Sequence, residues 1–178
     1  EPAEIEAMVQ TILDRAETLD ILINNVGSFL VRNITEVTPN EWNNSLASTV
    51  TATFLSCRAV LPSMAKQGYG RIINFADASA DHLVAAPNIT PYLVGKTGVL
   101  ILTKSLAIAY ADQGITVNSI SPGIIENSVT KPSGGRNAIP SGRFATIEDI
   151  TNAVLFLLKD ASSYITGANL KVGGGWNA

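Results

Sequence analysis

The sequence is poor in cysteine, histidine and charge. Cys57 is its only cysteine and His82 its only histidine, while charged residues make up 15% of the 178 positions. A single thiol forms no internal disulfide, and no cluster of Cys, His or carboxylate residues has the spacing of metal ligands. We therefore expect no metal, a core role for Cys57, a surface loop for His82 and a reducing, cytoplasmic compartment.

Long apolar runs and basic clusters are also missing. No apolar run reaches about 18 residues, so no membrane span is expected, and the acidic start E-P-A-E-I-E-A lacks the basic region of a signal peptide. The net charge of −3, without a Lys/Arg cluster, argues against nucleic acid or an anionic membrane as the main partner. An apolar content of 46% excludes a disordered chain.

Helical and strand-like segments alternate along the chain. Helical spacing of apolar residues is found at 3–18, 41–66, 92–112 and 146–158, and short apolar runs typical of strands buried on both faces at 21–24, 71–75, 115–121 and 168–172. This alternation predicts a single α/β domain over residues 1–178, with a doubly wound parallel sheet of Rossmann type. Pro62 is expected to disturb the helix 41–66.

Two features of this pattern concern ligands. Ligands of such sheets bind beyond the carboxyl ends of the strands, and Asn24, Asp77, Ser79 and the pair Pro122-Gly123 directly follow predicted strands. Residues 122–143 are rich in Gly, Pro, Ser and Asn, with little periodicity, and are expected to form a long loop that serves as a substrate lid.

Tyr92 and Lys96 carry the main chemical signal. They lie four residues apart at the start of the helix 92–112, so both face the same side, one turn apart. A lysine ammonium close to a phenol lowers the phenol's pKa. Such a phenol can give a proton to a carbonyl oxygen, or take one from an alcohol, while a hydride moves at carbon. The pair alone is a weak motif and depends on its context.

That context is a set of ordered motifs. N-N-V-G, G-R-I-I-N, Y-L-V-G-K, I-T-V-N-S-I-S-P-G and a final segment from G-R-F-A-T to K-V-G-G-G-W follow one another. Together they resemble the short-chain dehydrogenase/reductases of the single-domain type, close to the 3-oxoacyl-carrier-protein reductases, over the whole chain. The resemblance implies a homo-oligomeric enzyme, a dimer or tetramer, that reduces a carbonyl compound such as a 3-oxoacyl thioester. Its cofactor would be NADP or NAD, with NADP favoured.

The resemblance also implies roles for individual residues. Tyr92 would be the general acid/base, and Lys96 would lower its pKa and bind the nicotinamide ribose. Asn24 and Gly27 would line the adenosine side of the cofactor and stabilise the central strand. The nicotinamide carboxamide would face Pro122, Gly123 and Ile125. Taken alone, N-N-V-G and Pro122-Gly123 are also compatible with simple turns.

The sequence departs from the family at the glycine-rich loop that approaches the pyrophosphate. This loop should lie some tens of residues before N-N-V-G, yet the first glycine is Gly27. We therefore expect a chain that is N-terminally incomplete and lacks the first βαβ part. The 178 residues alone should bind the dinucleotide poorly and be prone to associate. This departure leaves a non-catalytic, oligomerising remnant as an alternative to the enzyme.

Two catalytic positions also differ. The register of the family's catalytic asparagine falls on Thr49, whose hydroxyl either holds a relay water or only packs the helix. The carbonyl-polarising serine corresponds to Asp77 by the register after G-R-I-I-N, and to Ser79 by counting thirteen residues back from Tyr92. An aspartate here resembles the pteridine reductases of the family. Since an ionised carboxylate only accepts hydrogen bonds, we expect Ser79 to serve a ketone and Asp77 a pteridine or dihydrofolate-type substrate.

Overall fold

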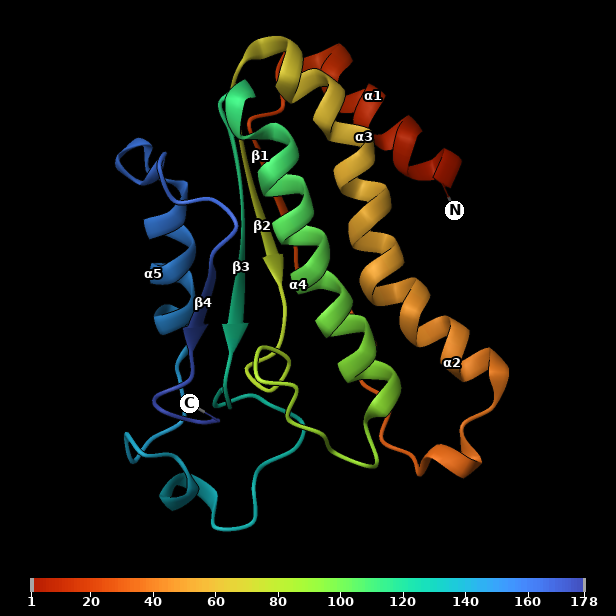
Figure 1. Cartoon of the computed structure of the whole chain (residues 1–178), viewed down its shortest axis with the longest axis vertical. Helices are drawn as coiled ribbons and strands as arrows, with labels where there is room; N and C mark the ends of the chain where they lie inside the picture. Colours follow the sequence, from red (N-terminus) through yellow and green to blue (C-terminus); the bar gives the residue numbers. More distant parts are fainter. Residues whose placement is uncertain (1, 178) are drawn as a thin grey trace.

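The computed structural model describes residues 2–177 and has an α/β architecture (Figure 1). One sheet of four parallel strands, in the order β1-β2-β3-β4, forms its centre. The strands are β1 (Ile21–Asn24), β2 (Gly70–Phe75), β3 (Ile115–Pro122) and β4 (Asn169–Val172). Parallel neighbours that follow one another in sequence require a crossover helix between each pair. The fold therefore confirms the doubly wound Rossmann-type sheet that the alternation of elements predicts.

Helices cover both faces of the sheet (Figure 1). Helices α1 (Pro2–Ala16), α3 (Ala52–Gln67) and α4 (Thr90–Tyr110) lie on one face, and α5 (Ile147–Leu158) lies on the other. Successive side chains of a strand point to opposite faces. Ile72 accordingly packs in the core beneath α3, while Ile73 packs against α5. This two-sided burial is why the strands are continuous apolar runs in the sequence.

Strand β1 differs from the prediction of a strand buried on both faces. It pairs with β2 in the described part of the chain and forms one edge of the sheet. Leu22 packs against the core under α1 and α3, but Ile21 and Ile23 are 47% and 45% exposed. Their face of the sheet is covered by α5 only further along, over β2, β3 and β4. Two apolar side chains therefore remain in solvent at an open sheet edge.

The helix expected over residues 41–66 is divided, but not at Pro62. Helix α2 (Pro39–Leu46) begins with a capping box formed by Thr38 and Glu41, and a π-helical turn, Ala47–Thr51, separates it from α3. Within this turn Thr49 Oγ1 donates to the carbonyl of Ser45 over 2.7 Å. Threonine hydroxyls that bond to the preceding turn bend helices, whereas α3 continues through Pro62. The expected disturbance at Pro62 is therefore wrong, and the irregularity belongs to Thr49.

Helix α4 is the longest helix in the described chain. With the following 3-10 turn it spans Thr90–Gln113 and is long and apolar enough to cross a membrane, by length and composition only. It packs against β3 and contributes Val99, Leu100 and Ala107 to the core. A buried core helix meets the same two criteria, so α4 is only weak evidence for a membrane span. After β3, residues 123–143 contain only a short 3-10 turn at Gly135–Ala138, as expected for a long loop.

Candidate active site

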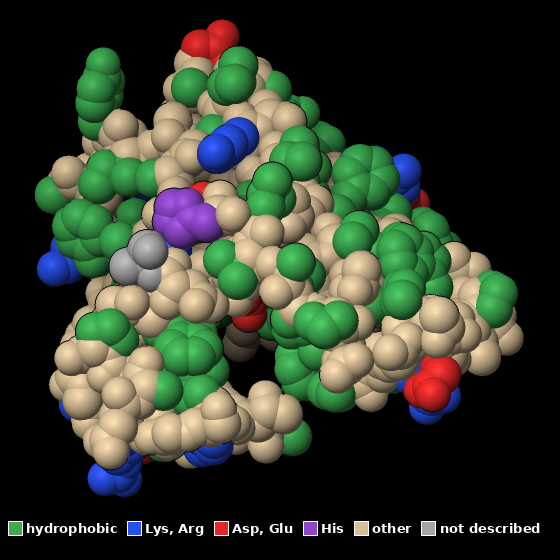
Figure 2. Space-filling view, turned by 60° about the horizontal axis from the view of Figure 1, so that its bottom comes forward, with side chains coloured by type: hydrophobic (Ala, Val, Ile, Leu, Met, Phe, Trp, Pro, Cys, Tyr) green, Lys and Arg blue, Asp and Glu red, His purple; other side chains and the backbone are tan. Residues whose placement is uncertain are grey.

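A cleft of about 320 Å³ lies at the carboxyl ends of the strands, and we call it the first cleft. It contains seven of the residues singled out in the sequence: Gly27, Asp77, Tyr92, Lys96, Pro122, Gly123 and Ile125. Figure 2 views the molecule from this end and shows a hollowed surface with hydrophobic side chains around the hollow. The purple histidine, His82, is exposed on the same face, as predicted.

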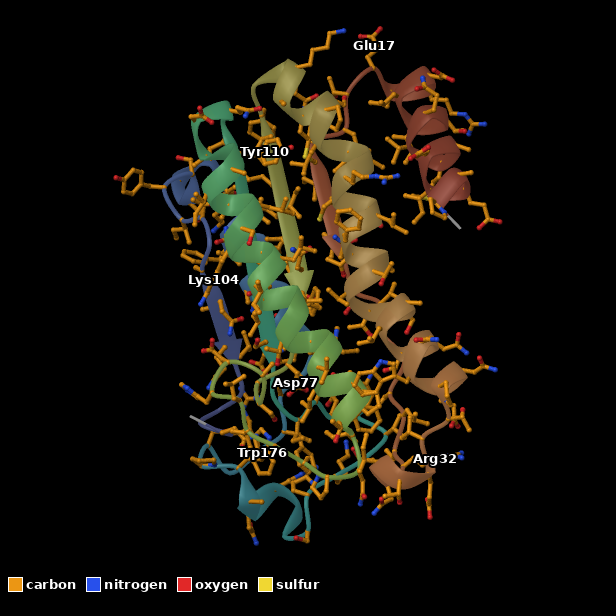
Figure 3. The ribbon with its side chains drawn as sticks, turned by 45° about the vertical axis from the view of Figure 1, so that its right-hand side comes forward. Glu17, Arg32, Asp77, Lys104, Tyr110 and Trp176 are labelled. Atoms are coloured by element: carbon orange, nitrogen blue, oxygen red, sulfur yellow. The ribbon has the colours of Figure 1, made fainter. Side chains whose placement is uncertain are left out.

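Tyr92, Asp77 and Lys96 meet in the first cleft. The Tyr92 hydroxyl, on α4, donates a hydrogen bond of 3.2 Å to Asp77 Oδ2, in the loop that follows β2. Lys96 Nζ lies 5.7 Å from the centroid of the Tyr92 ring and donates to the carbonyl of Phe75 over 2.7 Å. Figure 3 shows Asp77 near the first turns of α4, at the opposite end of the sheet from Glu17 and Tyr110.

The electrostatics of this group correct one expectation. The pKa of the Tyr92 phenol is raised, first by burial and then by the charge and hydrogen bond of Asp77. Lys96 was expected to lower that pKa, but its ammonium donates to a backbone carbonyl, while the Asp77 carboxylate accepts the hydrogen bond of the phenol. The pKa of Lys96 itself is lowered to about 8 by burial, an effect that Asp77 partly offsets.

The side chains of Asp77 and Ser79 contact different partners in the structure. Asp77 reaches Tyr92 with one carboxylate oxygen and accepts a bond from the backbone N–H of Ser79 with the other, over 2.8 Å. The Ser79 hydroxyl points elsewhere and accepts a hydrogen bond of 2.9 Å from Asn177 Nδ2. The register after G-R-I-I-N therefore identifies the side chain that is in contact with Tyr92.

Ser79 lines a second cleft, also of about 320 Å³. The two clefts share the wall formed by Phe29, Asp77, Pro122, Gly123 and Ile124. The ring of Phe29 stands edge-on to that of Tyr92, with centroids 5.0 Å apart. The rest of the second cleft is lined by Ala78, Ser79, Val84, Ala86, Ile89, Trp176 and Asn177. Sequence reasoning missed Phe29, Trp176 and Asn177, because no spacing rule connects such distant positions.

Thr49 is fully buried and does not line the first cleft. It lies against Gly27, where an added Cβ would be 3.2 Å from Thr49 Oγ1 and 3.4 Å from Lys96 Nζ. Only a residue without a side chain fits comfortably between these two groups. Thr49 thus packs beneath the loop that follows β1, and its hydroxyl already donates to the carbonyl of Ser45.

Asn24 belongs to a polar network inside the sheet layer. Its Nδ2 donates to Asn74 Oδ1 over 2.9 Å, and Asn74 Nδ2 donates to Thr103 Oγ1 over 3.0 Å. These bonds link β1, β2 and α4 just below the cleft, so Asn24 ties the strands together without lining the cleft. The thiol of Cys57 is buried beside them, and this burial raises its pKa to about 12. Cys57 has the core position that was expected.

Comparison with known proteins decides the family. A family model described as enoyl-(acyl carrier protein) reductase matches residues 1–177. D-beta-hydroxybutyrate dehydrogenase of Rhizobium meliloti is 34% identical, over 99% of this chain and 75% of that protein. The 3-oxoacyl-[acyl-carrier-protein] reductase of Vibrio harveyi is 36% identical over 96% of this chain and 72% of that protein. The same enzyme of Escherichia coli is 34% identical over 98% of this chain and 73% of that protein. The chain belongs to the short-chain dehydrogenase/reductase family.

Membership of the short-chain dehydrogenases/reductases confirms the resemblance and makes the protein an oxidoreductase, and its relatives imply a nicotinamide cofactor. The first cleft suits one end of such a cofactor. A Cβ at Gly27 would lie 3.4 Å from Lys96 Nζ, and one at Gly123 would lie 2.7 Å from Gly173 Cα, so these two glycines let the cleft wall pack closely on its neighbours. The 178 residues contain no glycine before Gly27 with which to approach a pyrophosphate. Within residues 2–177, no three His, Cys, Asp or Glu side chains are grouped to hold a metal ion.

Proposed function

We propose that the protein is an NAD(P)-dependent reductase of ketones, with Tyr92 as the proton donor. The observation that carries this proposal is the meeting of Tyr92 and Lys96 in a cleft at the carboxyl ends of β1, β2 and β3. Lys96, Gly27, Pro122, Gly123 and Ile125 would hold the cofactor. When bound, it supplies the hydride that adds to the carbonyl carbon.

Tyr92 would supply the proton that the reaction consumes. As the carbonyl carbon gains the hydride, its oxygen becomes an alkoxide, and the phenol gives its proton to that oxygen. Burial and Asp77 raise the pKa of Tyr92, so the phenol is protonated and ready to donate at neutral pH. Lys96, with a pKa of about 8, donates its hydrogen bond to the Phe75 carbonyl and lies 5.7 Å from the ring centroid, so it would act on the phenolate formed only as a nearby positive charge.

The proposal also covers the cofactor, the location, the lid and the assembly of the protein. We infer NADP rather than NAD from the carrier-protein reductases among the relatives, and a cytoplasmic location from the single buried thiol. Residues 122–143 would act as the lid, since Ile124, Ile125 and Val129 line the first cleft. A homodimer or tetramer would cover the exposed apolar residues of α4, Val94, Ile101 and Ile108.

A pteridine or dihydrofolate-type reductase is the second candidate. It is favoured by the hydrogen bond between Tyr92 and Asp77, which places a carboxylate where a substrate nitrogen would need a proton partner. A ketone oxygen cannot hydrogen-bond to such a carboxylate, because both groups only accept hydrogen bonds. The two candidates therefore differ in what they require of Asp77.

One assay separates the candidates. The full-length gene product that carries these residues is incubated with NADPH or NADH and either a 3-oxoacyl thioester or a dihydropteridine, and cofactor oxidation is followed by absorbance. We expect oxidation with the thioester and a preference for NADPH. Oxidation with the dihydropteridine alone would replace the first candidate by the second. Oxidation with neither, together with no dinucleotide binding in calorimetry, would support a non-catalytic, oligomerising remnant.

A further inference from the structure

The second cleft has a distinctive lining. Apart from Asp77, no charged side chain of the described residues lines it. Aromatic and aliphatic groups dominate, from Phe29, Val84, Ile89 and Trp176. Its volume of about 320 Å³ is at the small end of the range for ligand pockets, roughly 300–1,000 Å³. Such a cavity suits a small, uncharged and largely apolar molecule.

Lys96 and Lys171 each contact a residue next to or in this cleft, but both are hydrogen-bonded to backbone carbonyls. Lys96 lines the first cleft and donates to the Phe75 carbonyl over 2.7 Å. Lys171 donates to the backbone carbonyl of Asn177 over 2.7 Å, but its side chain lines a separate hollow together with Arg143 and Asp149. A carboxylate in the second cleft would thus meet Asp77 without a compensating cation, and like charges at close range are strongly unfavourable.

Ser79 and Asn177 supply the polar side of the cleft. Asn177 Nδ2 donates to Ser79 Oγ over 2.9 Å, which occupies a lone pair of the hydroxyl. A serine hydroxyl also has one proton to donate, and no hydrogen bond within residues 2–177 uses that proton. The amide of Asn177 therefore leaves Ser79 as a donor toward the cleft.

We propose that the second cleft selects uncharged carbonyl compounds over carboxylates, and that Asn177 is a positioning residue that holds Ser79 as the hydrogen-bond donor to the carbonyl oxygen. This proposal rests on the ketone reduction proposed above. Asp77 and Phe29 belong to both clefts, so a carbonyl group bound beside Ser79 lies next to the cleft that contains Tyr92 and Lys96. The shared wall joins the substrate's side of the site to the cofactor's side.

A matched substrate pair tests the selection. Ethyl acetoacetate and acetoacetate carry the same ketone and differ in one negative charge. With the full-length gene product, we expect kcat/KM to be about tenfold or more higher for the ester. Val84→Lys, which places a cation at a 40% exposed position of the cleft, should shift the preference toward acetoacetate. Equal or better use of acetoacetate by the natural protein would overturn the selection while leaving ketone reduction intact. Turnover of neither compound would overturn the selection, and the 3-oxoacyl thioester assay described above would then show whether the proposed function fails as well.

Variants of Asn177 test the positioning role. Asn177 has a φ of +50°, a region that Asn and Asp tolerate and alanine does not, so Asn177→Asp is the informative change. A carboxylate there would accept the Ser79 proton and remove it from the substrate. We expect kcat for the ester to fall about tenfold, with the cofactor's KM unchanged, because the bond to the carbonyl oxygen strengthens in the transition state.

A double variant completes this test. If Asn177 acts through Ser79, Asn177→Asp adds no further loss in a Ser79→Ala background. Asn152→Asp, the same change at an exposed position of α5, serves as the control for charge and should leave kcat unchanged. Additive losses, or a loss that falls on the cofactor's KM instead of on kcat, would show that Asn177 has only a structural role.

Discussion

The hydroxyl of Tyr92 lies 3.2 Å from Asp77 Oδ2 and donates its hydrogen bond to that carboxylate. The group proposed to protonate a substrate is therefore held in its protonated form, first by its burial and then by this carboxylate, because both disfavour a phenolate. In ketone reduction this is the required starting state. A substrate oxygen then has to compete with Asp77 for the phenolic proton.

Tyr92→Phe should remove most turnover while leaving cofactor affinity nearly unchanged. The phenylalanine ring keeps the edge-on contact with Phe29 but has no proton to give. General acid catalysis typically contributes about 10²–10⁴-fold, so kcat should fall by about that factor. Steady-state kinetics gives kcat, and calorimetric titration with NADPH gives the affinity. A variant that retains a near-normal rate would rule out Tyr92 as the proton donor.

Reduction should lose efficiency as the pH rises through about 8. The pKa of Lys96 is lowered to about 8 by burial, so its positive charge is present below that pH and is lost above it. Tyr92, whose pKa is raised, keeps its proton over the same range. We expect kcat/KM for ketone reduction to decline by about tenfold per pH unit above pH 8, as for a single titrating group.

A matched pair of variants checks the assignment of this decline. Lys104 lies on the same helix as Lys96 but is exposed, and Figure 3 shows it on the outer side of α4. Lys104→Ala should leave the pH profile as it is, whereas Lys96→Ala should abolish the decline, weaken cofactor binding and lower activity. Unaltered cofactor affinity in Lys96→Ala would exclude the proposed ribose contact.

Alanine variants distinguish Asp77 from Ser79. If the substrate is a ketone, Ser79→Ala should lower kcat/KM more than Asp77→Ala, since only the hydroxyl donates a hydrogen bond. If the substrate is a dihydropteridine, the order should be reversed. Both variants are assayed on a 3-oxoacyl thioester and on a dihydropteridine. Loss of thioester reduction in Asp77→Ala, with Ser79→Ala active, would contradict the assignment of the donor.

The α/β class with a parallel sheet and most element boundaries follow from apolar periodicity, because buried parallel strands and amphipathic helices leave distinct patterns. Tyr92 and Lys96 were also predictable, since one helical turn fixes their relation. The partners that come from distant segments were not. Neither the bond from Asn177 to Ser79 nor the packing of Phe29 on Tyr92 has a sequence signal. The raised pKa of Tyr92 depends first on its burial, which the sequence does not show, and then on Asp77, which two register rules could not place uniquely.

We predict that the outer face of α4 is buried at an interface between identical chains. Ile101 and Ile108 are 63% and 84% exposed, and they lie seven residues apart on one side of the helix. An exposed apolar stripe of this kind typically marks an interface. Light scattering of the full-length gene product should give the mass of a dimer or tetramer. The double variant Ile101→Glu, Ile108→Glu should give a smaller species, while Asn152→Glu, on the exposed side of α5, should not. A natural protein that is monomeric, or a double variant with unchanged mass, would show that this face remains in solvent.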